Sequence, residues 1–305
     1  MPDTQSATIP ALPMESERAP APARAAQTWA PWMPYLLVAL VVTAIYYQVV
    51  GKLVSDWYTN PDFSHGFLVV PFALYVLWDK RKVLRDTPIQ QTWSGVWLIV
   101  AAIFVLFMGV YGAELFLSRL SLVMLLGGIV WTLCGRAMLR EVRFAVLVLL
   151  LAIPIPAVLF NQITFPLQLL ASRMASSLLP LFGVPVLRDG NIIQLPSMQL
   201  EVAEACSGIR SLMSLFAVAI FYGYFLERGT WRRVILALAS IPIAVFANAA
   251  RIVGTGLCVQ YWNPDKAVGF FHEFSGWLMF LISLSSLYIV HSLMRLKIPA
   301  GRKSK

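Results

Sequence analysis

The chain has 305 residues, of which 59% are hydrophobic and only 13% are charged, and its mean hydropathy is +0.72. This composition excludes an ordinary soluble domain and predicts an all-α polytopic membrane protein. The net charge of +9 does not indicate nucleic-acid binding, because the basic residues collect in short loops between apolar runs and form no stripe interleaved with aromatic side chains.

The chain begins with residues 1–28, which are rich in Ala, Pro, Ser and Thr and predict a disordered tail. Basic residues are sparse there and the first apolar run starts too late for a signal peptide. Residues 29–296 predict one multi-spanning membrane domain, and 297–305 a basic cytoplasmic tail. About eight transmembrane helices are expected at the apolar runs Pro34–Val50, Gly66–Trp78, Gly95–Gly112, Leu115–Leu133, Phe144–Phe160, Gly208–Leu226, Val234–Val259 and Phe274–Leu293.

The segment 161–207 is the only sizeable piece expected outside the membrane. Its first part, Pro166–Leu179, has helical apolar spacing and predicts a helix that lies in the membrane interface. Its second part places Asp189-Gly190 between apolar residues that favour strands, which is typical of a β-hairpin.

The distribution of charge predicts the orientation in the membrane. The positive-inside rule places both termini in the cytoplasm, and the segment 161–207 then falls on the outer, periplasmic side of a bacterial inner membrane. Seventeen of the 24 basic residues share the cytoplasmic side in this arrangement: Arg18, Arg24, Lys80, Arg81, Lys82, Arg85, Arg136, Arg140, Arg143, Arg228, Arg232, Arg233, Arg295, Lys297, Arg302, Lys303 and Lys305.

The stretch Glu201-Val-Ala-Glu-Ala-Cys-Ser-Gly-Ile-Arg210 places polar groups at the outer end of the sixth apolar run. Cys206 is expected at the start of that helix, where unpaired N–H groups and the helix dipole favour a thiolate. Arg210 follows four residues later and shares a helix face with Cys206. Glu204 belongs to the same cluster. This pattern is typical of an activated thiol nucleophile.

The other two cysteines, Cys134 and Cys258, lie in or at the ends of apolar runs, where small buried side chains are expected. None of the cysteines has CxxC spacing, so neither a zinc site nor a disulfide framework is predicted. We expect no metal and no organic cofactor.

The seventh run contains Asn248 and Arg251, which share one helix face, and Arg251 is expected near the outer boundary of the membrane. One interpretation is an arginine that extends to lipid headgroups. The functional alternative is a fixed cation that binds a carboxylate or stabilises an oxyanion, with Asn248 helping to hold it.

Two of the three histidines are expected on the outer side. His272 lies where the eighth run starts, and its imidazole can deprotonate a thiol and later protonate a leaving amine. His65 is a rival base, or a residue that caps or positions its helix. His291, near the cytoplasmic end of the last run, is predicted to be a surface histidine at a helix C-terminus.

Three blocks of this sequence resemble the exosortase/archaeosortase family of membrane cysteine transpeptidases: Glu204-Ala-Cys-Ser-Gly-Ile-Arg210, Asn248-Ala-Ala-Arg251 and His272. Pro61-Asp-Phe-Ser-His-Gly-Phe67 and Val186-Leu-Arg-Asp-Gly-Asn-Ile-Ile-Gln-Leu-Pro196 are similar to the family as well. The resemblance runs from about Pro34 to Leu293, and the length suits a short bacterial exosortase, such as the B type.

The resemblance implies a catalytic site of Cys206, Arg251 and His272 that cleaves the C-terminal sorting tails of exported proteins. Such a tail carries a short motif such as Pro-Glu-Pro, one membrane helix and a basic cluster. The expected partners are therefore these exported proteins and membrane lipid, and bacterial members commonly accompany exopolysaccharide production. Glu204, Arg210, Asn248 and His65 are expected to support the site or bind the tail.

Three alternatives remain at this point. A polytopic carrier or flippase for a lipid-linked glycan would use Arg210 and Arg251 to bind phosphate, and it should tolerate Cys206→Ser. A glutamate-dependent membrane protease would use Glu201 and Glu204, although these carboxylates are three residues apart rather than adjacent. A structural scaffold would leave the outer polar cluster without a role.

Overall fold

The computed structural model describes residues 33–202, 208–262 and 270–297, with the side chains of residues 34, 208, 209, 270–273 and 297 excepted. Contacts divide the chain into two units, Met1–Ile45 and Tyr46–Lys305, and the boundary falls within helix α1 (Met33–Thr59). In the first unit, the described part of α1 exposes apolar side chains such as Leu36, Leu37 and Leu40, as expected of a helix in lipid.

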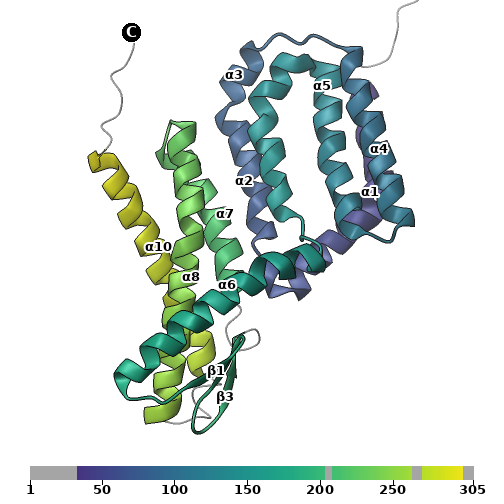
Figure 1. Cartoon of the computed structure of the whole chain (residues 1–305). Helices are drawn as coiled ribbons and strands as arrows, with labels where there is room; N and C mark the ends of the chain where they lie inside the picture. Colours follow the sequence, from purple (N-terminus) through teal and green to yellow (C-terminus); the bar gives the residue numbers. More distant parts are fainter. Residues whose placement is uncertain (1–32, 203–207, 263–269, 298–305) are drawn as a thin grey trace, which may run out of the picture. The chain divides into compact units, whose positions relative to one another are not determined.

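The second unit is built mainly from helices (Figure 1). After α1 they are α2 (Gly66–Asp79), α3 (Arg81–Asp86), α4 (Val96–Tyr111), α5 (Leu115–Val148), α6 (Ala157–Leu178), α7 (Gly208–Leu226), α8 (Thr230–Tyr261) and α10 (Phe270–Lys297). Within the described residues, five helical segments have the length and composition to cross a membrane: Tyr35–Thr59, Trp93–Tyr111, Leu115–Ala152, Thr230–Tyr261 and Phe274–Leu296. Arg210–Leu226 is apolar but shorter. These helices confirm the predicted all-α polytopic class.

Helix α5 folds back on itself at Gly135 (Figure 1). Gly135 has φ 91° and ψ 174°, a backbone conformation that side chains disfavour, and a Cβ there would collide with the carbonyl oxygen of Gln90. The arms 115–134 and 136–148 run side by side, so that Val146 reaches the neighbourhood of Gly127. The single α5 therefore supplies two antiparallel helical arms of unequal length.

The predicted span Phe144–Phe160 is wrong. The helix ends at Val148, a 3-10 turn covers Leu149–Ala152, and α6 begins at Ala157. The reason is Pro154 and Pro156, because a proline lacks the N–H that helix continuation requires and restricts the residue before it. The apolar run is thus shared between two helices.

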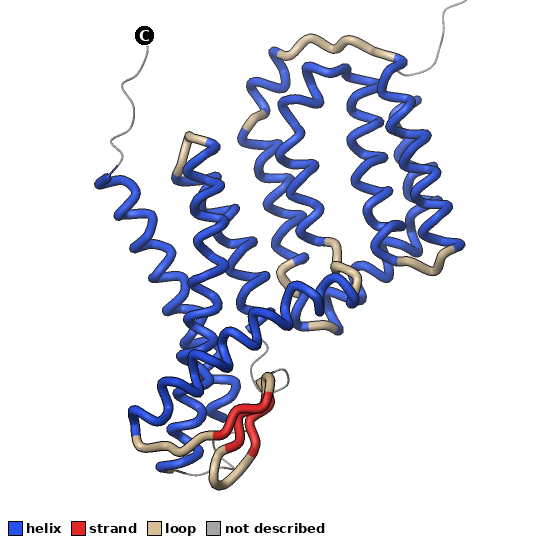
Figure 2. The backbone as a smooth tube through the Cα atoms, viewed as in Figure 1, coloured by secondary structure: helices blue, strands red, loops and turns tan. Residues whose placement is uncertain are grey.

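The predicted β-hairpin is confirmed, and a third strand extends it. Strands β1 (Leu187–Asp189) and β2 (Ile192–Gln194) pair antiparallel around Gly190, and β3 (Gln199–Glu201) pairs with β2 (Figure 2). One face of this sheet packs against α6 and α8 in a core cluster that consists of Ala171, Ala175, Leu179, Val184, Ile193, Leu195, Leu200, Val202, Ala249, Ile252, Val253, Cys258 and Val259. The helix predicted over Pro166–Leu179 forms the second part of α6, which continues through Pro166.

Aromatic packing joins α2 to α7. The rings of Phe72 and Phe221 stack with their centroids 4.0 Å apart, and the Tyr224 hydroxyl donates to Asp79 Oδ2 at 2.8 Å. Near the other end of α2, the indole N–H of Trp57, which belongs to α1, donates to the carbonyl of Ala152 at 2.7 Å. This hydrogen bond joins the end of α1 to the 3-10 turn that follows α5.

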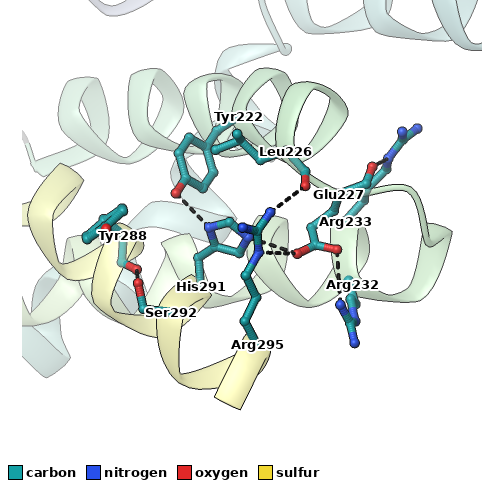
Figure 3. A network of polar contacts seen from close by, with 9 residues as sticks. All are labelled: Tyr222, Leu226, Glu227, Arg232, Arg233, Tyr288, His291, Ser292 and Arg295. Carbon is teal, nitrogen blue, oxygen red and sulfur yellow. Dashed lines mark hydrogen bonds and ion pairs between the residues drawn. The ribbon is translucent and has the colours of Figure 1, made fainter. Parts of the chain in front are cut away.

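A buried polar network joins α7, α8 and α10 at the end of α7 (Figure 3). Glu227 is 5% exposed; its Oε1 accepts from His291 Nε2 at 2.8 Å and from Arg295 Nε at 3.3 Å, and its Oε2 accepts from Arg232 at 3.4 Å. His291 is 3% exposed and its Nδ1 lies 2.7 Å from the Tyr222 hydroxyl. The prediction of a surface histidine is therefore wrong, because His291 meets a carboxylate from a distant part of the chain.

The network stabilises an ionised Glu227. Burial raises the pKa of this carboxyl, but hydrogen bonds from His291, Arg295 and Arg232 outweigh burial and hold the pKa below its ordinary value of 4.5. A carboxyl group whose pKa is lowered by folding stabilises the folded state at pH values above its ordinary pKa. This stabilisation is lost as the pH falls through the pKa of the folded state. The contribution is thus present at neutral pH and lost below about pH 4.5.

We expect Glu227→Gln to destabilise the protein at neutral pH by about 1–3 kcal/mol, because an amide N–H₂ would face cationic donors in place of the carboxylate. The measurement is thermal unfolding in nanodiscs at several pH values, and the difference from wild type should shrink below pH 4.5. Glu141→Gln is the matched control: the Lys80–Glu141 pair, at 3.1 Å, has side chains that are about one third exposed and should matter much less. Equal effects of the two substitutions at neutral pH would contradict the prediction.

Candidate functional site

A cavity of about 560 Å³ brings together polar residues that are distant in the sequence. Its walls come from the start of α2, from α7, from α8 and from the first turns of α10. The residues that line it are Ser64, His65, Leu68, Arg210, Ser211, Ser214, Ala217, Val218, Phe221, Arg251, Gly276, Trp277 and Phe280. Three of the predicted site residues, His65, Arg210 and Arg251, therefore share one cavity. Phe221, Trp277 and Phe280 also line the cavity, so its lining combines polar and aromatic side chains.

Arg251 lies in the second half of α8 and is only 8% exposed. Its Nε donates a hydrogen bond to Ser275 Oγ on α10 at 3.1 Å, and the guanidinium lies beside the backbone of Gly276. The Thr255 hydroxyl, one turn further along α8, donates to the backbone carbonyl of Arg251 at 3.0 Å. A guanidinium that is buried and hydrogen-bonded inside the protein does not extend to lipid headgroups, so the functional interpretation of this arginine is favoured.

Arg210 lies in the first turn of α7 and is more exposed than Arg251. Its Nε contacts Asp62 Oδ1 at 3.4 Å, and its side chain is 54% exposed. Asp62 belongs to the 3-10 turn Pro61–Phe63, which Asn60 caps by accepting from the Asp62 N–H at 3.0 Å. An ion pair this exposed stabilises little, but it shows that the start of α7 lies beside the 3-10 turn that precedes α2.

His65 occupies the position just before α2 and is 7% exposed. Its Nε2 lies 3.0 Å from the carbonyl oxygen of Leu151, which can only accept, so Nε2 carries the proton. Its Nδ1 is buried and has no hydrogen-bond partner within the part of the chain that the structure describes. This arrangement suits a residue that ties the start of α2 to the turn after α5 better than a freely accessible base.

Asn248 lies on the same helix as Arg251 but lines a different, small cavity with Thr164, Gln168 and Leu212. That cavity has room for about one water molecule, with a volume of about 20 Å³. The Asn248 Oδ1 atom is buried without a hydrogen-bond partner among the described residues. The structure therefore places Asn248 toward α6 and α7. Arg251 instead has a hydrogen-bond partner on α10, Ser275.

Cys206 and Glu204 lie outside the described residues, and so does the side chain of His272. The neighbouring described positions are informative. Arg210, four residues after Cys206, and Gly276, four residues after His272, both line the cavity. Cys258 packs in the core beneath the sheet, as predicted for a small buried side chain, and Cys134 is half-buried. Among the described residues no cluster of His, Cys, Asp or Glu could hold a metal ion.

Sequence reasoning missed Asp62 and Ser275 as individual residues. Asp62 stands in the quoted stretch Pro61–Phe67, but a carboxylate in a loop carries no signal of its own until its partner is known. Ser275 lies three residues after His272, and serines are common in membrane helices, where they often satisfy their own backbone. The contact with Arg251 distinguishes it from those serines.

The comparison with protein-family models gives one match, to the transmembrane exosortase model (Exosortase_EpsH), over residues 57–289. The matched region includes α2, α7 and α8, the first turns of α10, and every cavity residue named above. Comparisons with curated proteins and with solved structures give no match. The family model covers about three quarters of the chain, and the chain therefore belongs to the transmembrane exosortase family.

Proposed function

We propose that this protein is a membrane cysteine transpeptidase or protease whose reaction takes place at the mouth of the 560 Å³ cavity. The observation that carries the proposal is the burial of Arg251 in a cavity that α7 and α10 also line. Cys206 lies two residues before α7, so chain connectivity keeps its Cα within about 7 Å of that of Gly208. His272 belongs to the first turn of α10. Membership of the exosortase family supports the general reaction class.

The chemistry starts with Cys206. A free thiol has a pKa of about 8.5, so it must lose its proton to a base to react near neutral pH. His272 accepts that proton, and the thiolate attacks the scissile carbonyl carbon. The tetrahedral intermediate collapses to a thioester as the C–N bond breaks, and His272 returns the proton to the leaving amine. Water or an amine acceptor then attacks the thioester and regenerates the thiol.

Arg251 stabilises the oxyanion of this intermediate or orients the thiolate. Its guanidinium is held in a buried environment, where a fixed positive charge acts more strongly than in water. His65 supports the site from the start of α2, since its Nε2 is committed to the Leu151 carbonyl. Arg210 and Glu204 support the site or bind the substrate tail.

The proposed substrates are exported proteins that end in a Pro-Glu-Pro-like motif, one membrane helix and a basic cluster. The proposed location is the bacterial inner membrane, with both termini in the cytoplasm and the site on the periplasmic side. The proposed process is the sorting of proteins to the cell surface, coupled to exopolysaccharide production.

The test is co-expression with a reporter that carries such a tail, followed by detection of the shortened product. A reporter without the motif is the control, and equal processing of both reporters would contradict the proposed specificity.

We expect position 206 to be accessible from the periplasm. The distribution of 17 of 24 basic residues on the other side supports this orientation. A variant with Cys134→Ala and Cys258→Ala retains only Cys206, and a membrane-impermeant thiol reagent should label it in intact spheroplasts. Labelling of opened membranes is the control, because a pocket that is closed to the reagent would stay unlabelled there as well. Labelling that requires entry of the reagent into the cytoplasm would reverse the orientation.

A further inference from the structure

The hydrogen bond between Arg251 and Ser275 connects the two helices on either side of the buried guanidinium. Arg251 Nε donates to Ser275 Oγ at 3.1 Å, and each residue is 8% exposed. The Nε–H bond lies in the plane of the guanidinium group. A partner at Nε therefore fixes the direction of that plane and with it the directions of the four N–H bonds on the terminal nitrogens.

The residue after Ser275 lies near the same group. A Cβ built on Gly276 would lie 3.6 Å from one terminal nitrogen of Arg251 and 3.7 Å from its Cζ, which is ordinary van der Waals contact, so the guanidinium lies next to this turn of α10. An arginine side chain has many rotamers, and losing that freedom costs conformational entropy. In this structure α10 imposes the constraint before a substrate arrives, which is the arrangement that electrostatic preorganisation requires.

We propose that Ser275 is a positioning residue for Arg251: its hydroxyl orients the guanidinium so that the terminal N–H groups face the reacting carbonyl. This inference rests on the proposed function and adds a role that α10 performs besides supplying His272. Because Ser275 acts through Arg251 on a group that exists only in the transition state, its loss should lower kcat rather than weaken substrate binding.

The test is a kinetic comparison of Ser275→Ala and Ser275→Thr, purified in nanodiscs, with a reporter that carries the sorting tail. We expect Ser275→Ala to lower kcat by about 10-fold to 100-fold, the effect of losing a hydrogen bond to a charged group, with little change in KM. Ser275→Thr keeps an Oγ atom at the same position and should recover most of the rate. An increase in KM at unchanged kcat would overturn the proposal.

Ser283→Ala is the matched control for the loss of a buried serine hydroxyl from α10. Ser283 is 1% exposed and donates to the Met279 carbonyl at 2.8 Å, away from the cavity. Its substitution should leave kcat unchanged and shift the unfolding temperature about as much as Ser275→Ala does. A loss of kcat in Ser283→Ala equal to that in Ser275→Ala would show a general packing effect and overturn the positioning role.

A double-mutant cycle separates this proposal from the proposed function. In an Arg251→Lys background there is no Nε to orient, so adding Ser275→Ala should cost little more activity. If Arg251→Ala retains full activity, the proposed role of the arginine fails and the positioning role fails with it. If Arg251→Ala is inactive while Ser275→Ala is fully active, the proposed function stands and only the positioning role is overturned.

Discussion

Cys206→Ala should abolish processing of a co-expressed substrate while the protein still accumulates in the membrane. The proposed reaction requires a nucleophile that forms a thioester, and alanine supplies none. The measurement is the ratio of processed to full-length reporter at matched membrane levels of enzyme. We expect no product above the background of cells that lack the enzyme.

The other cysteines are the internal controls for this result. Cys258 is buried in the core beneath the sheet and Cys134 is half-buried on α5, so Cys134→Ala and Cys258→Ala should both retain activity. Cys206→Ser distinguishes the reaction class, because a glycan carrier should tolerate it and a thiol transpeptidase should not. Normal cleavage by Cys206→Ala would refute the cysteine mechanism.

Arg251→Lys should lose most of the activity although it keeps the positive charge. A guanidinium presents a planar fork of donors and can bond Ser275 through Nε, whereas a lysine ammonium is a point charge on a flexible stem. If the lost oxyanion stabilisation is ~3 kcal/mol, the rate falls by about two to three orders of magnitude. The measurement is a cleavage time course at matched membrane levels. Near-wild-type processing would reduce Arg251 to a merely electrostatic residue.

The two histidines should differ in the same assay. We expect His272→Ala to be as damaging as Arg251→Lys, and His65→Ala to be milder, because the His65 ring is bound to the Leu151 carbonyl. His65→Gln offers a sharper comparison, since its amide N–H₂ can replace the Nε2 donor and should retain more activity than His65→Ala. An inactive His65→Ala beside an active His272→Ala would move the role of base to the start of α2.

The sequence predicts most of the helices well because their apolar runs have clear ends. The predicted run Gly208–Leu226 coincides with α7, and the hairpin at Asp189-Gly190 forms as its turn chemistry indicates. The prediction of the fifth span was wrong because hydropathy does not show where backbone hydrogen bonding is interrupted. Pro154 and Pro156 are apolar and lie within an apolar run, although they end the helix. The bounds of α8 and α10 extend past their apolar cores because the helices continue through terminal turns that include polar residues.

The candidate site was predictable where the sequence placed a charged residue in an apolar run. Arg251 was found in this way, Arg210 from the polar stretch at the end of the sixth run, and His65 from its expected place on the outer side, and the structure brings the three to one cavity. Partnerships were not predictable, because they depend on how helices pack. His291 meets Glu227, which is 64 residues away in the sequence, and Arg251 meets Ser275 on the next helix. Neither pair follows any spacing rule within a single helix.

The packing of the sheet constrains the length of one connection more than the others. Val202 is held to the sheet by its N–H bond to the Asn191 carbonyl at 3.0 Å, and the sheet in turn packs on Ile252, the residue after Arg251. Gly208 begins α7, which packs along α8. The five residues between Val202 and Gly208, Cys206 among them, are therefore tethered at both ends to the helix that carries the arginine. Inserting or deleting a residue there should therefore impair the proposed reaction, which depends on the spacing between Cys206 and Arg251, whereas a change in length at the hairpin tip at Gly190 should not.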